Sequence, residues 1–357
     1  MQVSTDLVIH DGSDYIPDAI TGSFLEFFGK LSKFRYQFFL LTHLFVTLYV
    51  AFDALVTTKI IYVSMGVIYV VSLLQLFYGG ARPFWTTNSI LSCDCLNNYT
   101  HPSTGLVLML FVPYYFFYCS KKKAGEIFLG NMSKKELILG ILILVLTGVI
   151  QFLNYFTGTI FILNIALSFI CSLLIIMVAI SINTVLDQAV KKSTIIQVDA
   201  KKYVFYWLLF ICLLMAFVLI VYSGQDVFLD IDWVRNFISC TNYHEYDEMN
   251  YRYDEVVGPW FNFLQTATLF AWIGAVFGIS FCYRKMSVNQ WSQGSVKNRI
   301  IRVLIGNILI IPSWLFVAYL QTGSWIQDIG LNEFIVDAVH YFVLYIWLFG
   351  FMPVYIL

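Results

Sequence analysis

The chain has 357 residues, of which 59% are hydrophobic and only 12% are charged, and its formal net charge is −1. Its mean hydropathy is +0.76, and its apolar runs are long enough to cross a hydrocarbon core of about 30 Å. The runs are continuous, which excludes the alternating strands of a transmembrane barrel. The composition therefore predicts an all-α polytopic membrane protein, with no nucleic-acid partner, metal or other cofactor.

Nine membrane-spanning helices are predicted along the chain. They cover residues 36–56, 60–79, 103–119, 136–153, 159–182, 203–223, 259–282, 300–321 and 335–356. Four parts follow: an N-terminal segment (1–35), six spans (36–223), an acidic aromatic loop (224–258) and three C-terminal spans (259–357). Phenylalanines recur at helical spacing from Phe24 to Phe34, which is typical of an interfacial amphipathic helix or of the first turns of a longer first span.

The distribution of lysine and arginine predicts the orientation. The connections after spans one, three, five and seven, with Arg302 just beyond them, hold most of these residues, including Lys59, Lys121–Lys123 and Lys191–Lys192. The opposite side holds Lys30, Lys33, Arg35, Arg82, Arg235 and Arg252. The richer side is expected to face the cytosol, or the matrix if the membrane is mitochondrial. The sequence does not distinguish an endomembrane from the mitochondrial inner membrane.

The loop at 224–258 and three cysteines fall on the lysine-poor side. The loop interleaves carboxylates with Trp233 and several tyrosines. Calcium or a basic partner would suit the carboxylates, but calcium-loop spacing is lacking, which favours a solvated loop whose aromatic side chains dock on the membrane interface or another subunit. An oxidising compartment would allow one disulfide between Cys93 or Cys95 and Cys240. The cysteines within spans, such as Cys119, are interpreted as small apolar fillers.

Three short segments at helix ends carry a resemblance. They read Gln-Leu-Phe-Tyr-Gly-Gly-Ala-Arg-Pro-Phe (75–84), His-Pro-Ser-Thr-Gly (101–105) and Thr-Gly-Thr-Ile-Phe-Ile-Leu-Asn-Ile-Ala-Leu-Ser (157–168). Their order and spacing resemble the three motifs of the type 2 phosphatidic-acid phosphatase superfamily. The predicted number of spans and the length look most like its glucose-6-phosphatase branch. The resemblance implies a six-helix phosphatase-like core in residues 36–223.

The same resemblance implies that the catalytic groups are lost. Gln75 stands where the family has a phosphate-binding lysine, whereas Arg82 and Ser103 are kept. Gly105 replaces the histidine that protonates the leaving group, and Thr157 and Gly158 replace a Ser-Arg pair. Asn164 replaces the nucleophilic histidine, and Ser168 replaces the aspartate that orients it. A carboxamide cannot form the phospho-enzyme that imidazole forms, and loss of a nucleophile costs on the order of 10⁶ in turnover.

The leading hypothesis is a catalytically inactive phosphatase-like protein, a structural or accessory subunit of a larger membrane complex. In this interpretation membrane lipids and protein subunits are its partners, and the residual pocket around Arg82, Ser103, Thr157 and Asn164 either holds a lipid headgroup or is filled by side chains. The alternatives are an active lipid or sugar phosphate phosphatase with atypical chemistry, and a lipid or solute transporter. His43 and His340 lie within spans, where they either line a cavity or have a hydrogen-bonded packing role, which is favoured.

Overall fold

The computed structural model describes part of the chain at the level of its elements. These parts are residues 34–51, 54–86, 99, 102–123, 134–156, 160–194, 200–224, 232–233, 235–236, 263, 265–285, 295–321 and 330–355. The predicted interfacial helix before residue 34, Thr157, Gly158, His101 and the three cysteines of the predicted disulfide lie outside them.

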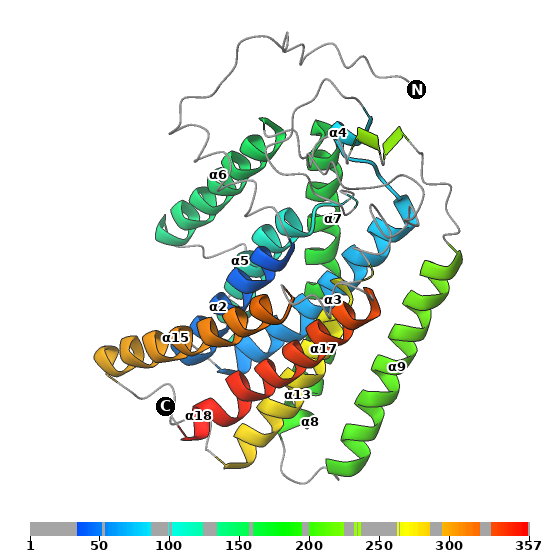
Figure 1. Cartoon of the computed structure of the whole chain (residues 1–357). Helices are drawn as coiled ribbons and strands as arrows, with labels where there is room; N and C mark the ends of the chain where they lie inside the picture. Colours follow the sequence, from blue (N-terminus) through cyan, green and yellow to red (C-terminus); the bar gives the residue numbers. More distant parts are fainter. Residues whose placement is uncertain are drawn as a thin grey trace.

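The described residues are almost entirely helical and contain no strand, as the composition predicts. The helices, in chain order, are α2 (Phe34–Ala51), α3 (Ala54–Tyr78), α4 (Pro83–Thr86), α5 (Thr104–Lys123), α6 (Lys134–Phe156), α7 (Ile162–Ser181), α8 (Asn183–Thr194), α9 (Ala200–Gly224), α13 (Thr268–Lys285), α15 (Val296–Gln321), α17 (Gly330–Ile346), the π-helical turn η1 (Trp347–Phe351) and α18 (Met352–Tyr355). Each range predicted as a span overlaps at least one of these helices (Figure 1).

Five helical stretches are long and apolar enough to cross a membrane. They are Ala54–Tyr78, Ile162–Ser181, Phe205–Ser223, Val296–Phe316 and Phe334–Val354. Shorter apolar stretches occur at Gln37–Ala51, Gly140–Phe152 and Thr268–Cys282. The number of helices that cross the membrane, and their orientation, stay predictions.

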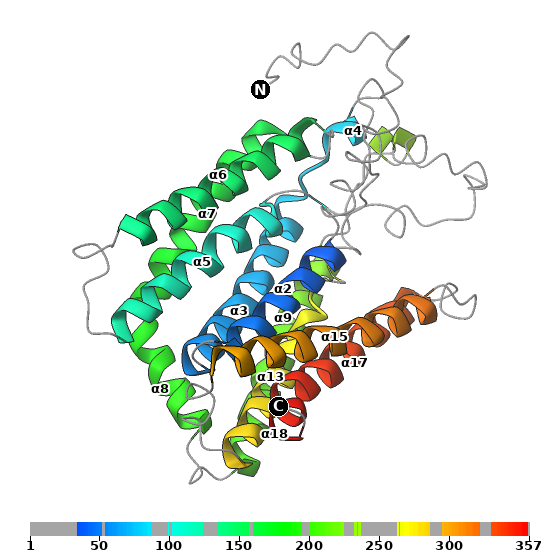
Figure 2. The ribbon, with the colours of Figure 1, turned by 90° about the vertical axis from the view of Figure 1, so that its left-hand side faces the viewer.

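The helices pack into a bundle in which α3 and α13 are central. Helix α13 packs along α17 and against α3, α5 packs between α3 and α7, and α15 lies against α2. Figure 2 shows α5 and α6 side by side on one flank, with α15 and α17 on the other. Two helices lie where the sequence suggested connections: the four-residue α4, and α8, which follows α7 after a break at Ile182.

Helices α6 and α7 have a polar interior face and an apolar exterior face. The buried residues of α7 are Asn164, Ser168, Ser172 and Ala179. Its leucines and several of its isoleucines point outward, with Leu163 65% exposed. On α6 the buried side chains include Thr147, Gln151 and Asn154, whereas Leu142 is 59% exposed. This distribution is the reverse of that in a water-soluble helix. It is the pattern expected where hydrocarbon surrounds the bundle and polar groups must find partners inside.

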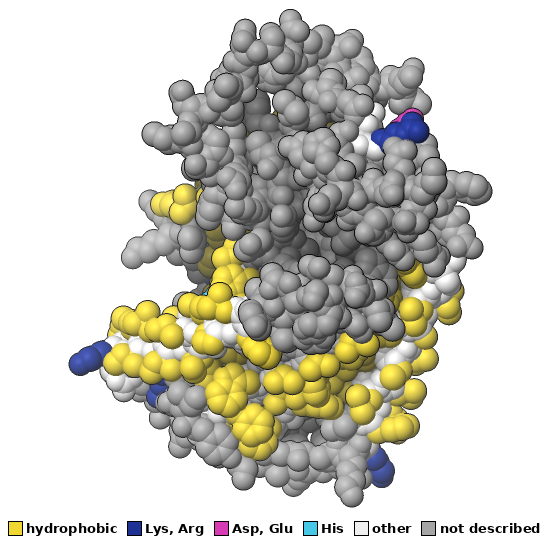
Figure 3. Space-filling view, viewed as in Figure 1, with side chains coloured by type: hydrophobic (Ala, Val, Ile, Leu, Met, Phe, Trp, Pro, Cys, Tyr) yellow, Lys and Arg dark blue, Asp and Glu magenta, His cyan; other side chains and the backbone are white. Residues whose placement is uncertain are grey.

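The surface agrees with that distribution. Figure 3 shows apolar side chains covering the described parts of one face, across α15, α17 and α9, with Lys and Arg at the margins. The apolar side chains of this face come from several helices, whereas soluble monomers rarely expose large contiguous apolar patches. Such a surface is suited to contact with lipid.

Small residues set the contact between α13 and α17. A Cβ at Gly274 would lie 2.5 Å from the carbonyl oxygen of Phe342, and a Cβ at Gly278 would lie 3.0 Å from the nitrogen of Gly350. Gly350 belongs to η1, so backbone meets backbone at the π turn. Glycines four residues apart allow two helices to approach this closely, as in other membrane bundles.

We therefore expect Gly274→Ala to lower the stability of the protein by about 1–3 kcal/mol, the usual cost of overpacking. The new methyl group would meet backbone, so α13 and α17 would have to separate. Thermal unfolding of the purified full chain in detergent measures the effect. Gly148→Ala on α6 is the matched control, because nothing lies within 4 Å of its Cβ position. Equal unfolding temperatures for the two variants would contradict the role of Gly274.

Candidate functional site

The structure brings together most of the described motif positions, drawn from four helices. We call this set the motif-side cluster: Gln37 on α2, Gln75 on α3, Ser103, Thr104 and Gly105 at the start of α5, and Asn164 and Ser168 on α7. Gln75, Thr104, Asn164 and Ser168 are buried. The cluster forms because α3 ends and α5 and α7 begin at the same end of the bundle.

Local signals set those helix ends. Gly79 has φ +53, a left-handed conformation that glycine adopts without strain, and its N–H donates to the Gln75 carbonyl at 3.0 Å. This C-terminal arrangement ends α3. Ser103 caps α5: the N–H of Leu106 donates to Ser103 Oγ at 3.5 Å, the geometry that serine favours before a first turn.

The side-chain amide of Gln75 donates hydrogen bonds within the cluster. Its Nε2 donates to the Pro102 carbonyl at 2.7 Å and to Thr104 Oγ1 at 3.3 Å. A lysine in this place would carry a charge toward a phosphate, whereas the neutral amide joins the end of α3 to the start of α5. The side chain at this position is therefore part of the scaffold.

The Ser168 hydroxyl also forms hydrogen bonds within the cluster. Its hydroxyl donates to the Asn164 carbonyl at 2.6 Å and accepts the N–H of Ser103 at 2.7 Å. The hydroxyl therefore links α7 to the start of α5. Asn164, one turn earlier on α7, is completely buried, and its carboxamide is a poor nucleophile because the nitrogen lone pair is delocalised into the carbonyl.

Gly105 is covered by a side chain from another helix. A Cβ at this position would lie 2.7 Å from Gln37 Nε2 and 3.0 Å from Gln37 Cδ. Gln37 therefore occupies the space in which the resemblance would place an acid histidine. Sequence reasoning missed Gln37, because nothing in the segment around it pointed toward Gly105.

Arg82 and Trp85 lie in the segment that follows α3. Arg82 is 5% exposed, and its carbonyl accepts the N–H of Trp85 at 3.0 Å. Trp85 packs against Tyr99 and against Trp233 of the acidic loop, with ring centroids 6.1 Å apart in each pair. Docking of Trp233 on the membrane interface or another subunit stays a prediction, and the structure adds a contact within this chain. Asn236 of the same loop donates to the Trp85 carbonyl at 2.7 Å.

Tyr99 is not suited to acid–base chemistry at neutral pH. Burial raises the pKa of Tyr99 to about 12. A general acid or base works best with a pKa near the operating pH. The Tyr99 phenol therefore stays neutral and contributes its ring to the contact with Trp85.

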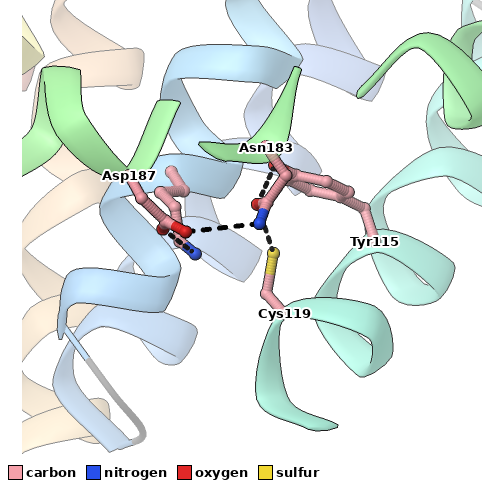
Figure 4. A network of polar contacts seen from close by, with 5 residues as sticks. Tyr115, Cys119, Asn183 and Asp187 are labelled. Carbon is pink, nitrogen blue, oxygen red and sulfur yellow. Dashed lines mark hydrogen bonds and ion pairs between the residues drawn. The ribbon is translucent and has the colours of Figure 1, made fainter. Parts of the chain in front are cut away.

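A second polar cluster lies toward the other end of α3. In this Lys59 network, Lys59 Nζ bonds to Asp187 Oδ1 at 2.6 Å, and Asn183 Nδ2 donates to Asp187 Oδ2 at 3.3 Å. Tyr115 OH donates to Asn183 Oδ1 at 3.0 Å, and Cys119 Sγ lies 3.8 Å from the same oxygen. Figure 4 shows the side chains of α5 and α8 pointing toward one another around Asn183. The network joins α3, α5 and α8.

The sequence interpretation placed Lys59 in a connection between spans. The structure places it inside α3, with its side chain 10% exposed and paired with a carboxylate on α8. The sequence held one signal for this pair, a single lysine in an otherwise apolar stretch, because a charge within a membrane needs a partner. The partner is Asp187, which lies on α8, a helix that was not predicted.

The two histidines that the sequence placed within spans, His43 and His340, both contact side chains of α15. His43 Nδ1 lies 2.6 Å from Asn307 Oδ1, which joins α2 to α15. Asn307 Nδ2 donates to Thr47 Oγ1, so its oxygen is the acceptor and Nδ1 of His43 carries the hydrogen. His340 packs edge-on against Trp314 at 5.2 Å. The described cysteines Cys119, Cys171, Cys212 and Cys282 form no disulfide.

Comparisons with protein-family models, with curated proteins and with solved structures gave no match for this chain. The phosphatase resemblance therefore stays a prediction.

We expect separate removal of Lys59 or Asp187 to destabilise the protein, because each change leaves the other charge poorly compensated. The cost of Lys59→Met should fall between that of a surface pair, about 1 kcal/mol or less, and that of a fully buried pair, roughly 3–5 kcal/mol. Adding Asp187→Leu should recover part of the loss. Thermal unfolding of the two single variants and the double variant measures the coupling.

The exposed pair of Arg235 and Asp232, 3.6 Å apart with side chains 60% and 71% exposed, is the control. Arg235→Met should change stability by less than about 0.5 kcal/mol. Additive losses for Lys59 and Asp187 would show that the two side chains are not coupled.

Proposed function

We propose that this chain is a polytopic membrane protein with a phosphatase-like arrangement of helices and no phosphatase activity, and that it is a structural or accessory subunit of a larger membrane assembly. The support is the bonding within the motif-side cluster. Gln75 and Ser168 stand at positions where the resemblance implies catalytic groups, and both hold helices together. Gln37 covers Gly105, where a proton donor would be needed.

The chemistry of the cluster supports a lack of turnover. Phosphoryl transfer to an enzyme requires a nucleophile, a proton donor for the leaving oxygen and positive charge around phosphorus. The described residues of the cluster are amides, hydroxyls and glycine, and none of them is a strong nucleophile or a cation. Three separate requirements are therefore unmet by these residues.

In this proposal the cluster contributes to binding a lipid headgroup. Arg82, in the segment after α3, supplies positive charge for a phosphate, and Ser103 and Asn164 lie at the ends of α5 and α7 where a headgroup would arrive. Outward-facing leucines and isoleucines of α6 and α7 would contact the acyl chains. These two helices have a polar inner face and an apolar outer face, which suits a lipid with a polar headgroup and apolar acyl chains.

The first test is phosphate release by the purified chain, with its native lipids, from phosphatidic acid and from glucose 6-phosphate. We expect no release above the rate in buffer for either substrate. Arg82→Ala is the control for any signal. Release that Arg82→Ala abolishes would overturn the proposal and establish an active phosphatase with a nucleophile outside the cluster.

The second test concerns assembly. A subunit of a larger complex, extracted from its own membrane in a mild detergent, should migrate on native electrophoresis well above the mass of its 41.2 kDa chain plus a detergent micelle. Harsh detergent should return it to the size of the single chain. Migration as a single chain under both conditions would contradict the accessory role while leaving the inactive site unaffected.

A further inference from the structure

Positively charged side chains gather at the end of the bundle where α3 begins. We call this set the basic end, and its described members are Lys59 on α3, Lys121 on α5, Lys202 on α9, and Lys297, Arg299 and Arg302 on α15. Among the described side chains of this end, Asp187 is the one carboxylate, and Lys59 neutralises it. The described part of this end therefore carries an excess of positive charge.

Contacts with α3 place the members on α5 and α9 at this end. Tyr62 of α3 packs against Trp207 of α9, with ring centroids 5.9 Å apart. The hydroxyl of Tyr69, two turns later on α3, donates to the Leu214 carbonyl at 3.0 Å. Helices α3 and α9 therefore run in the same direction and begin at the same end. The Lys59 network joins the start of α3 to the last turns of α5.

Contacts with α2 place the members on α15 at the same end. His43 of α2 bonds to Asn307 of α15, and Phe39, one turn earlier on α2, packs against Trp314, two turns later on α15. Helices α2 and α15 therefore run in opposite directions. Since α2 leads into α3 through a short connection and packs against it, α15 begins where α3 begins.

Helix α8 lies at the same end and has the character of a membrane-surface helix. The backbone leaves the helical path at Ile182, and Figure 2 shows α8 turning away from the direction of α7. Asn183 and Val190 are buried toward α3, α5 and α13, whereas Ile182 is 42% and Val185 66% exposed. A short helix that follows a span and presents apolar side chains outward is suited to the boundary between headgroups and acyl chains.

The sequence of the connections at this end has the same charge excess. The segments 120–135, 183–202 and 283–299 each contain more lysine and arginine than acid, and their acidic residues are Glu126, Asp187 and Asp199. Basic residues beside a membrane helix attract lipids of negative net charge, each strengthening the binding by about fivefold. A surface of this charge at the level of the headgroups is complementary to such lipids.

We propose that the basic end binds anionic phospholipids in the leaflet that it faces. This inference goes beyond the proposed function, because Arg82 and the motif-side cluster lie at the other end of α3. Exposed Lys202 and Lys297 contact the negatively charged headgroups, and α8 lies among them. The recognition is by charge, so phosphatidylserine and phosphatidylglycerol bind and phosphatidylcholine, which has no net charge, binds less.

The test is native mass spectrometry of the purified full chain, after incubation with an equimolar mixture of phosphatidylserine, phosphatidylglycerol and phosphatidylcholine that share the same acyl chains. The wild-type protein should retain both anionic lipids over phosphatidylcholine, and the preference should weaken as the salt concentration rises, because salt screens exposed charges. The double variant Lys202→Gln, Lys297→Gln should reduce the preference about ten- to thirtyfold.

The matched control is Arg235→Gln, which removes an exposed cation near Trp85, toward the other end of α3. It should keep the wild-type preference. Thermal unfolding shows whether each variant is folded, and if the double variant does not fold, each single change should reduce the preference about fivefold. Wild-type preference in the folded double variant, or equal retention of the three lipids by the wild-type protein, would overturn the proposal.

Arg82→Ala separates this surface from the proposed headgroup site. Loss of the preference in the double variant but not in Arg82→Ala supports binding at the basic end. Loss in Arg82→Ala with the preference kept in the double variant would place the anionic lipid at the motif side and overturn the proposal. A preference that high salt leaves unchanged would also contradict recognition by exposed charges.

Discussion

Hydrogen bonding within an apolar surrounding is the constraint on which this arrangement depends. In hydrocarbon no water is present to pair with a free amide or hydroxyl, so a polar side chain is expected to turn inward or to bond to a carbonyl of its own helix. Helices α6 and α7 carry serine, threonine, asparagine and glutamine on their inner faces, and the hydroxyls of Thr147 and Ser172 bond to the carbonyl four residues earlier. The motif-side cluster and the Lys59 network are two results of the same requirement, at different levels of α3.

The two polar clusters differ in the way they join helices. The motif-side cluster uses neutral groups, and its bonds run between a helix end and the helix beside it, as from Ser103 to Ser168. The Lys59 network uses an ion pair supported by Asn183, whose side chain contacts both Asp187 and Tyr115. An ion pair away from bulk water is favourable only when further hydrogen bonds satisfy its atoms. Asn183 supplies one of these bonds.

Much of the helical arrangement could be predicted from the sequence, because long apolar runs determine where helices lie. The positions of Gln75, Ser103 and Ser168 at neighbouring helix ends also followed from motif spacing, and the structure brings these residues together. The partners across the bundle could not be predicted. Gln37 against Gly105, and Lys59 with Asp187, each depend on how two helices cross, and hydrophobic periodicity carries no information about that crossing.

Contacts within the chain were also missed where composition pointed to the surroundings. Helix α8 has many polar residues after an apolar span, so the sequence suggested a connection there, yet the buried Asn183 of α8 bonds to Tyr115 of α5. Trp233 suggested a membrane anchor because tryptophan is common at interfaces, and its packing against Trp85 could not be read from composition.

The π turn at Trp347–Phe351 has a consequence for the phase of the last helical segment. A π turn holds one residue more than an α turn, so the residues after Phe351 are rotated by about 100° relative to an uninterrupted α-helix. Met352 is fully buried in this phase, and its side chain would contact a Cβ at Gly306 of α15. The sequence from Gly330 to Tyr355 therefore contains two hydrophobic registers, and a one-residue deletion in the π turn would merge them and turn Met352 away from α15.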